Sequence, residues 1–482
     1  MLLSSIFLLL LFCIFVISLV PIKNIFLIKQ FCLIISGLVL ILSVILLLNL
    51  NFNFYYFQYL TTLTLDINFL NIIFAFGLDS ISIYFFVLTS LLSFLCVLFS
   101  WTNTNSKDFF FNLILLELLL LLVFSVLDLI LFYIFFEAIL IPMFLIIGML
   151  GSRSRKIRAA YLLFFYTLIG SILMLVGIIY IYFIVGTSSF EIIFSYNFSL
   201  QEQQWLWLAF FISFASKIPM FPFHIWLPEA HVEAPTVGSV LLAGILLKLG
   251  VYGFLRFSLT LFSEASLYYS PFVYVLCIIG ILYSSFTAIR QTDIKRIIAY
   301  SSIAHMNLVV LGIFSFNIIG LEGSILQSLS HGFVSGGMFL LVGILYDRYH
   351  SRLLYYYGGL VHVMPLYSFF FLAFTLANIA TPGTSSFVGE FLLLCGIYQI
   401  NIVTCFLSAF GVILSAVYSL WLYNRLVFGN LKIIFTQKFN DLVLRETVIL
   451  STLLLLILFF GVYPYFLLNG LKLYVTGMLN LF

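Results

Sequence analysis

Five ionisable side chains lie inside long apolar segments of this sequence, where a charge is costly to bury. They are Glu117, Glu137, Lys217, Lys248 and Glu390. Glu117, Glu137 and Lys248 lie about nine to twelve residues into their segments, close to the middle of a ~30 Å hydrocarbon layer. An ionised group there costs at least ~2.5–3.5 kcal/mol, so such groups normally face a bundle interior and line an ion or proton path. These residues therefore predict a buried row of proton-accepting groups, although any one of them could belong to an ion pair that only holds helices together.

Two histidines are candidates for relaying protons along that row. His305, in AYSSIAHMNLVV, and His331, in LQSLSHGFVSGG, fall in apolar segments with polar linings. An imidazole with a pKa near ~6.5 can both accept and donate a proton, although a membrane histidine can equally be held by structural contacts. His224 and His231 flank a Trp-Leu-Pro tripeptide, where an interfacial or loop position is expected.

Two aspartates and the cysteines carry less information. Asp79 and Asp128 lie at span ends, where we expect them to cap helices or to anchor them at the interface. The six cysteines lie in apolar runs and form no C-x-x-C pair, so they are expected to pack as small hydrophobic residues. Iron–sulfur ligation and a disulfide framework are not supported, and we expect no cofactor or metal to be bound by this chain.

Two of the charged positions adjoin predicted helix breaks. Lys217 precedes Pro219 and Pro222 in FASKIPMFPFHIWLP, and Glu390 follows the Thr-Pro-Gly tripeptide at 381–383. Proline removes a backbone donor and clashes with the preceding turn, so both spans should be interrupted. In lipid, broken helices are tolerated only where they line a cavity or the protein interior, and their freed carbonyls provide polar linings.

The composition requires that these segments cross a membrane. Hydrophobic residues make up 64% and charged residues 8% of the 482 residues, and the mean hydropathy is +1.25. Too few charges remain for the polar shell of a soluble protein, so no soluble domain is expected. The N-terminus lacks the positive leader of a signal peptide and the arginines of a transit peptide, so the first segment is predicted to be a retained span.

We predict an all-α polytopic membrane protein of about 14 spans, with discontinuous helices 7 and 12. The two interrupted spans lie five spans apart, and a five-span unit repeated in tandem must be inverted relative to itself. We therefore predict a single membrane domain with helices 1–3 in 1–108, a first inverted repeat in 109–255, a second in 271–428 and a last helix in 429–482. The predicted spans are 2–20, 30–49, 81–101, 109–126, 129–149, 159–185, 205–227, 236–255, 271–289, 296–315, 321–346, 366–400, 406–428 and 447–470.

The distribution of basic residues supports this count of spans. Of the 20 Lys and Arg residues, all except Lys217, Lys248, Arg256 and Lys472 fall in odd-numbered loops. A wrong number of spans would mix the two kinds of loop, so the bias supports fourteen spans and places both termini on the outer side. The odd-numbered loops hold Lys23, Lys29, Lys107, Arg153, Arg155, Lys156, Arg158, Arg290, Lys295, Arg296, Arg348, Arg352, Arg425, Lys432, Lys438 and Arg445.

A long motif gives the sequence a family resemblance. The stretch from Lys217 to Arg256, KIPMFPFHIWLPEAHVEAPTVGSVLLAGILLKLGVYGFLR, resembles the central signature of the antiporter-like proton-translocating membrane subunits of respiratory NADH:quinone oxidoreductase (complex I). The blocks at 127–148, 291–308 and 381–392 resemble further blocks of that family in the same order. The resemblance implies fourteen helices in inverted five-helix repeats.

The resemblance also assigns roles to the charged residues. It implies that Glu137, Lys217, Lys248 and Glu390 are the principal proton-path residues. His305 and His331 occupy positions similar to the connecting residues of the family, and Glu117 stays a further candidate. Glu390 stands where the sister subunits 2 and 5 typically carry lysine, and the chain stops soon after the last predicted span. Both features resemble the subunit-4 branch of the family.

The family's function follows as an expectation. The resemblance implies a core membrane-arm subunit that translocates protons across the mitochondrial inner membrane, with both termini on the intermembrane-space side. NADH, FMN, iron–sulfur clusters and ubiquinone would belong to the parent complex, whose other subunits oxidise NADH and reduce ubiquinone. The expected partners are other membrane-arm subunits, especially the sister subunits 2 and 5, and the lipid bilayer, with cardiolipin as a candidate lipid; nucleic acid is not expected.

Two other functions remain open. A subunit of a multi-subunit cation/proton antiporter would share the same row of Glu and Lys, and a sodium-dependent flux without any redox reaction would favour it. A structural spacer could carry the charges as remnants of a pump, and an unchanged proton stoichiometry after replacement of Lys248 would favour that alternative. Co-purification with flavin and iron–sulfur subunits would favour the respiratory function.

Overall fold

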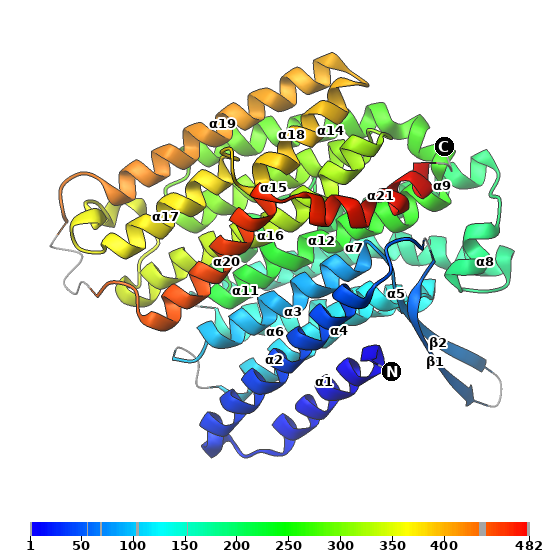
Figure 1. The fold of residues 1–482 in the computed structure, drawn as a ribbon, viewed down its shortest axis with the longest axis horizontal. Helices are drawn as coiled ribbons and strands as arrows, with labels where there is room; N and C mark the ends of the chain where they lie inside the picture. Colours follow the sequence, from blue (N-terminus) through cyan, green and yellow to red (C-terminus); the bar gives the residue numbers. More distant parts are fainter. Residues whose placement is uncertain are drawn as a thin grey trace. The chain divides into compact units, whose positions relative to one another are not determined.

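The computed structural model describes residues 2–54, 56–67, 70–102, 106–151, 153–432 and 440–479, and Lys438, predicted to lie in a loop, is outside these ranges. Within them, 12 helical segments are long and apolar enough to cross a membrane. They are α1 (Leu2–Leu19), α2 (Ile25–Asn49), α3 (Ser82–Phe99), α4 (Lys107–Ser125), the adjoining α5 (Leu129–Ala138) and α6 (Leu140–Leu150), α7 (Lys156–Val185), the run Thr236–Leu261, α14 (Ser263–Arg290), α15 (Ile294–Ile313), α16 (Ile318–Tyr349), α19 (Ile402–Val427) and α20 (Leu444–Val462) (Figure 1).

The two remaining predicted spans are interrupted where proline required it. Helix α9 (Leu200–Lys217) ends before the two prolines, and α10 (Trp226–Glu233) begins after them. Helix α17 (Pro365–Asn378) is separated from α18 (Ser385–Tyr398) by a turn in which Ala380 and Gly383 have φ values of 62° and 94°. With these two broken segments, the predicted all-α membrane fold is confirmed.

The run Thr236–Leu261 is longer and less regular than predicted. It consists of α11 (Thr236–Leu241), a π-helical turn (Leu242–Leu246), α12 (Leu247–Gly253), a second π-helical turn (Phe254–Ser258) and α13 (Leu259–Leu261). The predicted span ended at 255, which left Arg256 in a loop; that placement is wrong, because Arg256 lies in the second π-helical turn and is buried. Lys248 lies between the two π-helical turns, and such turns often mark functional sites.

An antiparallel hairpin follows α2, in a segment to which no span had been assigned. Strands β1 (Gln58–Ile67) and β2 (Leu70–Leu78) pair from Ile67↔Leu70 to Thr61↔Phe76, and a bulge precedes the last pair, Gln58↔Leu78. The Ala75 carbonyl at the end of β2 accepts a hydrogen bond of 2.9 Å from the Leu127 amide. This strand end is thereby joined to the turn that precedes α5.

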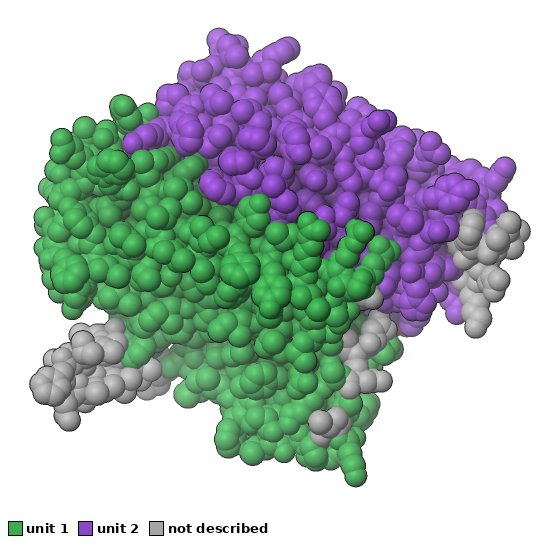
Figure 2. Space-filling view, turned by 180° about the vertical axis from the view of Figure 1, so that it is seen from behind, with its two compact units in different colours: residues 1–217, 252–268, 473–482 green, residues 218–251, 269–472 purple. Residues whose placement is uncertain are grey.

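The chain divides into two compact units, which are described separately. Unit 1 comprises residues 1–217, 252–268 and 473–482, and unit 2 comprises residues 218–251 and 269–472 (Figure 2). In unit 1, α7 packs against α9, and α3 packs against α2 and α4. In unit 2, α16 contacts α15, α17, α18 and α20, and its apolar stretch is entirely buried. The predicted division into two inverted repeats stays a prediction.

Glycines allow α16 and α18 to pack closely in unit 2. A Cβ added at Gly396 on α18 would lie 2.6 Å from the Cα of Gly320 on α16, and one added at Gly389 would lie 2.9 Å from the Cα of Gln327. Small residues at such contacts let two helix backbones approach. The side chains of Gln327 and Glu390 are thereby brought within hydrogen-bond distance.

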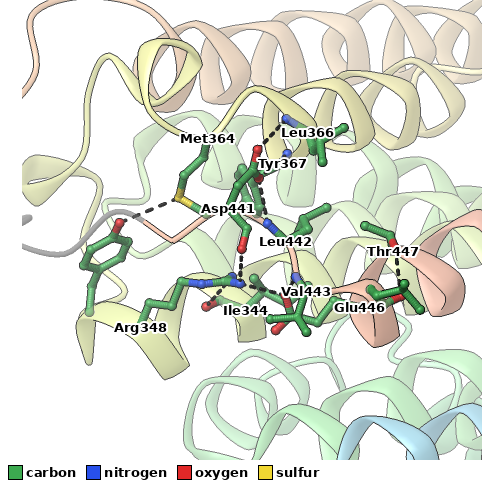
Figure 3. Close-up of polar contacts among 12 residues, drawn as sticks. Ile344, Arg348, Met364, Leu366, Tyr367, Asp441, Leu442, Val443, Glu446 and Thr447 are labelled. Carbon is green, nitrogen blue, oxygen red and sulfur yellow. Dashed lines mark hydrogen bonds and ion pairs between the residues drawn. The ribbon is translucent and has the colours of Figure 1, made fainter.

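A polar cluster joins the ends of three helices in unit 2. Arg348 at the end of α16 lies 2.7 Å from Glu446 on α20 and donates to the Asp441 carbonyl at 2.9 Å (Figure 3). The Asp441 carboxylate accepts hydrogen bonds from the Leu366 and Tyr367 amides, so it caps the start of α17. These contacts satisfy backbone donors that the helix start would otherwise leave free.

Candidate functional site

Glu137 and Lys217 form a loose ion pair in unit 1. Glu137 is the second-last residue of α5, which ends at Ala138 because the Ala138 carbonyl has no amide donor at Pro142. Lys217 is the last residue of α9, and its Nζ lies 4.0 Å from Glu137 Oε1. The same Nζ donates to the Phe136 carbonyl at 3.1 Å and lies 4.0 Å from the centre of the Phe136 ring. The amine is thus held by a carbonyl and a ring as well as by the carboxylate.

Lys248 lies in unit 2, next to a predicted histidine. Its Nζ is 2.8 Å from His331 Nδ1 and donates to the Ala243 carbonyl at 2.6 Å. That carbonyl belongs to the first π-helical turn, where the widened helix leaves it free of the usual partner. Lys248 is fully buried, and no acidic side chain forms an ion pair with it among the residues described. A proton can therefore pass between Lys248 and His331 through one direct hydrogen bond.

His305 and Glu390 form the other end of the same arrangement. His305 Nδ1 on α15 lies 2.9 Å from Glu390 Oε1 on α18, and Gln327 Nε2 on α16 donates to that oxygen at 3.0 Å. The ring centres of His305 and His331 are 5.9 Å apart. Four predicted residues thus form a row in unit 2, with direct contacts at both ends and one wider gap between the imidazoles.

Glu117 takes no part in either group. It is buried in α4, and neither of its carboxylate oxygens accepts a hydrogen bond from the residues that the structure describes. The structure therefore brings Glu137 and Lys217 together in unit 1. It brings Lys248, His331, His305 and Glu390 together in unit 2.

A second buried pair in unit 1 was not predicted. Asp79 Oδ1 accepts from the Ser82 amide at 2.9 Å, as expected of a cap, but Oδ2 accepts from Arg256 Nη2 at 2.6 Å. Arg256 also donates to the hydroxyls of Tyr252 and Tyr474, at 3.2 and 2.9 Å. These partners compensate for the burial of the guanidinium, which explains how it can lie inside a helix rather than in a loop.

The other predicted cap is formed as expected. Asp128 Oδ1 accepts hydrogen bonds from the amides of Ile130 and Leu131, at 2.9 and 3.0 Å, at the start of α5.

An ionic cluster in unit 2 also escaped prediction. Arg352, only 1% exposed, lies 3.7 Å from Glu233 and 3.9 Å from Asp293. Lys295, assigned to a loop from sequence, is instead buried in the first turn of α15 and donates to the Ala234 carbonyl at 2.9 Å. The sequence places Glu233, Asp293 and Arg352 near the ends of predicted spans. At such positions the sequence alone does not show whether a charged side chain is buried with a partner or exposed to solvent.

His231 is the remaining buried histidine of unit 2. An interfacial position was expected, but the residue is fully buried, and its ring stacks on Phe339 with centres 4.5 Å apart. The Ser239 hydroxyl donates to the His231 carbonyl at 3.2 Å and lies 3.4 Å from Lys295 Nζ. Both ring nitrogens lack a hydrogen-bond partner within the described ranges. The ring is buried because α10 packs against α11 and α15.

Comparison with known proteins places these residues in a family. A family model described as NADH:quinone oxidoreductase/Mrp antiporter, TM, matches residues 126–417. The NADH-ubiquinone oxidoreductase chain 4 of Chondrus crispus is 52% identical over 470 residues, which cover 97% of this chain and 95% of that protein. Chain 4 of Marchantia polymorpha is 59% identical over 321 residues, which cover 67% of this chain and 65%, or slightly less than two thirds, of that protein.

The fold agrees with the sequence comparison. One chain of respiratory complex I from Thermus thermophilus with bound NADH has a TM-score of 0.89 and 29% sequence identity, covering 100% of this chain and 99% of that chain. Among the residues described, no group of three or more His, Cys, Asp or Glu side chains could hold a metal ion. The resemblance inferred from the motifs is confirmed, and the chain belongs to the NADH:quinone oxidoreductase/Mrp antiporter membrane family.

Proposed function

We propose that this chain is a subunit-4-type membrane subunit of NADH:ubiquinone oxidoreductase that carries protons through its helix bundle. The observation that carries this proposal is the buried row Lys248–His331–His305–Glu390, in a chain similar to NADH-ubiquinone oxidoreductase chain 4. Other subunits hold NADH, FMN, iron–sulfur clusters and ubiquinone. The chain lies in the mitochondrial inner membrane, with both termini toward the intermembrane space, beside the sister subunits 2 and 5 and lipids such as cardiolipin.

The Glu137–Lys217 pair acts as the switch in this mechanism. Burial disfavours the charged form of each group, and an opposite charge nearby restores it. At 4.0 Å the pair is close enough for this coupling but is not locked by a direct hydrogen bond. A charge displaced in a partner subunit strengthens or weakens the pair and so decides whether Lys217 keeps its proton.

The proton then moves through the row in unit 2. A proton that Lys248 has taken up passes to His331 across their 2.8 Å contact. The 5.9 Å between the imidazole centres is crossed by a water or a ring rotation, and the 2.9 Å contact carries the proton from His305 to Glu390. Gln327 holds the receiving oxygen of Glu390 toward His305.

The ionic cluster around Arg352 and Lys295, together with His231, provides the route by which protons reach Lys248. His331, Ser335 and Phe339 are four residues apart on one face of α16, so His231, stacked on Phe339, lies about 12 Å along that helix from His331. On its other side the His231 backbone is linked through Ser239 to Lys295. This link reaches the backbone and not the ring, whose two nitrogens have no hydrogen-bond partner among the described residues, so the imidazole is available to accept a proton beside the central row.

Replacing the switch residues tests the proposal. Lys217→Ala or Glu137→Ala should lower proton-coupled quinone reduction by about two orders of magnitude, the scale of a lost acid–base group. Electron transfer from NADH to an artificial acceptor should be unchanged, because it does not involve this chain. Lys23→Ala, at an exposed lysine, is the matched control. Wild-type coupled rates in both switch variants would contradict the proposal.

The antiporter alternative keeps one specific support, since the matching family model also covers Mrp antiporters. A sodium-dependent proton flux in reconstituted vesicles without NADH would favour it. Retention of the flavin and iron–sulfur subunits through purification would favour the respiratory complex. If replacement of Lys248 left the proton stoichiometry unchanged, the chain would be a spacer rather than a carrier.

A further inference from the structure

A cavity of about 650 Å³ lies in unit 2, beside the end of α19 and apart from the buried row. Its walls come from the last turns of α19, the residues that follow that helix, and the segment after α16. The side chains that matter here are Tyr355, Trp421, Asn424, Arg425 and Lys432. The described residues that line this cavity include no aspartate or glutamate.

Two cations face this cavity from different segments. The Arg425 guanidinium lies 5.7 Å from the Trp421 ring centre and forms no hydrogen bond or ion pair with the described part of the chain. Lys432 Nζ donates to the Tyr355 carbonyl and lies 4.9 Å from the ring centre of Tyr355. Aromatic rings beside basic side chains are typical of the boundary between lipid and water. The cavity thus offers an anion two basic side chains, and its described lining holds no carboxylate that would repel the anion.

An apolar stripe on α19 leads to the same cavity. Ile413, Val417 and Leu420 are 61%, 48% and 43% exposed, and their spacing of three and four residues places them on one helix face. Continuing that face by one turn reaches Asn424 and Arg425, both exposed. An acyl chain lying along this stripe would place its headgroup at the two cations.

We propose that this cavity is a headgroup site for an anionic phospholipid whose acyl chains lie along α19. The unpaired guanidinium can bind a phosphate with two parallel hydrogen bonds, and the amine of Lys432 adds a second positive charge. The apolar stripe distinguishes a lipid from a free anion. A described lining with two basic side chains and no carboxylate favours an anionic headgroup over a zwitterionic one, whose ammonium group needs an acceptor. This inference deepens the lipid part of the proposed function and depends only on the chain spanning a membrane, not on the proton path.

Photo-crosslinking to the purified complex tests this site. Photoactivatable phosphatidylglycerol and phosphatidylcholine with identical acyl chains are added in competition, and the labelled peptides are mapped by mass spectrometry. Each cation near an anionic headgroup contributes about a fivefold factor, so labelling of α19 should favour phosphatidylglycerol about thirtyfold. The double variant Arg425→Gln/Lys432→Gln should lose this preference, and Arg425→Lys/Lys432→Arg should keep most of it. Arg158→Gln, at an exposed cation that does not line the cavity, is the control.

The outcomes separate the possible occupants. Equal labelling by both lipids, or a preference that survives in the double glutamine variant, would overturn the proposal. Loss of labelling on addition of inorganic phosphate alone would show a free-anion site and would also overturn it. NADH-driven proton transport in native membranes is measured in parallel, and the glutamine variants should retain it. Proton transport in the Lys217 and Glu137 variants therefore tests the proton path, whereas lipid labelling of α19 tests the headgroup site.

Discussion

Replacing Glu390 by glutamine removes the negative charge at one end of the buried row but keeps the shape of the side chain. In the native chain, Glu390 Oε1 lies 2.9 Å from His305 Nδ1 and accepts from Gln327 Nε2 at 3.0 Å. The side chains of His305 and Glu390 are only 7% and 4% exposed. Glu390→Gln would leave His305 beside a neutral amide that cannot take up its proton.

The size of the effect follows from this burial. A buried, hydrogen-bonded charge pair that loses one partner is destabilised by about 3–5 kcal/mol. Water hardly reaches this contact, so screening does not reduce the loss. Because a tenfold change in rate corresponds to about 1.4 kcal/mol, proton-coupled turnover should fall at least about 100-fold. The loss applies to the state in which His305 carries the proton, and the proposed path populates that state in every cycle.

The assay is NADH-driven acidification of inverted membrane vesicles, followed with a pH-sensitive dye. NADH oxidation by an artificial acceptor reports assembly of the redox subunits and should stay at the wild-type rate. Gln327→Leu is the matched control: it removes one hydrogen bond to a charged group, worth about 1.5–3 kcal/mol, and should cost clearly less than Glu390→Gln. The double variant Glu390→Gln/Gln327→Glu moves the carboxylate to the other side of the same contact and should recover part of the loss. Wild-type acidification by an assembled Glu390→Gln complex would refute the reasoning.

A lysine at position 390 offers a second check on the same contact. Glu390→Lys should keep partial function, because the family resemblance implies a lysine there in the sister subunits and because the Gln327 amide can turn its oxygen toward an amine. His305 would then have to present an unprotonated nitrogen, which should slow its loading. Complete inactivity in a normally assembled complex would count against this view.

Two further predictions concern the residues that the sequence did not reveal. Arg256→Met should leave Asp79 buried without its guanidinium partner and destabilise the assembled complex by about 3–5 kcal/mol, measured as a lower midpoint of thermal unfolding. The double variant Arg256→Met/Asp79→Leu should recover much of this stability, since apolar replacement of a buried pair is often neutral. Equal midpoints for the wild type and both variants would contradict the prediction. His231→Phe keeps the stacking on Phe339 but removes the ring nitrogens, so it should lower proton transport at least about tenfold without loss of assembly. The control His224→Phe should leave proton transport unchanged. Equal transport in both variants would remove His231 from the proposed path.

The positions of the charged residues could be read from the sequence because an ionised group in an apolar run needs an explanation. Their partners could not be read in the same way. Gln327 is a neutral residue in a polar-lined helix, and only the close approach of α16 and α18 at Gly389 makes it a neighbour of Glu390. The two residues in contact are 63 positions apart in sequence, and local periodicity carries no information about such a contact.

The positions of residues at span ends were predicted wrongly for a different reason. A boundary error of one or two residues decides whether Lys295 is a solvated loop cation or a buried donor to a backbone carbonyl. Arg256 looked like the end of a span, because its partner Asp79 lies 177 positions away. The alternating Thr and Leu of β1 are typical of a strand, but this segment is too polar to resemble a membrane span.

The distances within the buried pairs separate two kinds of charge in this fold. The Arg256 guanidinium has a carboxylate at 2.6 Å and two tyrosine hydroxyls within 3.2 Å, so every change in its protonation or position would break several contacts at once. Lys217 has its carboxylate at 4.0 Å and one carbonyl at 3.1 Å, which leaves the amine able to exist in either form. A fully satisfied buried charge fixes the position of a helix, whereas an incompletely satisfied one can change state when a neighbouring charge moves. The loose geometry of Glu137 and Lys217 is therefore consistent with the proposed switch. If they act in this way, a substitution that shortened the contact should slow proton transport even though it strengthened the pair.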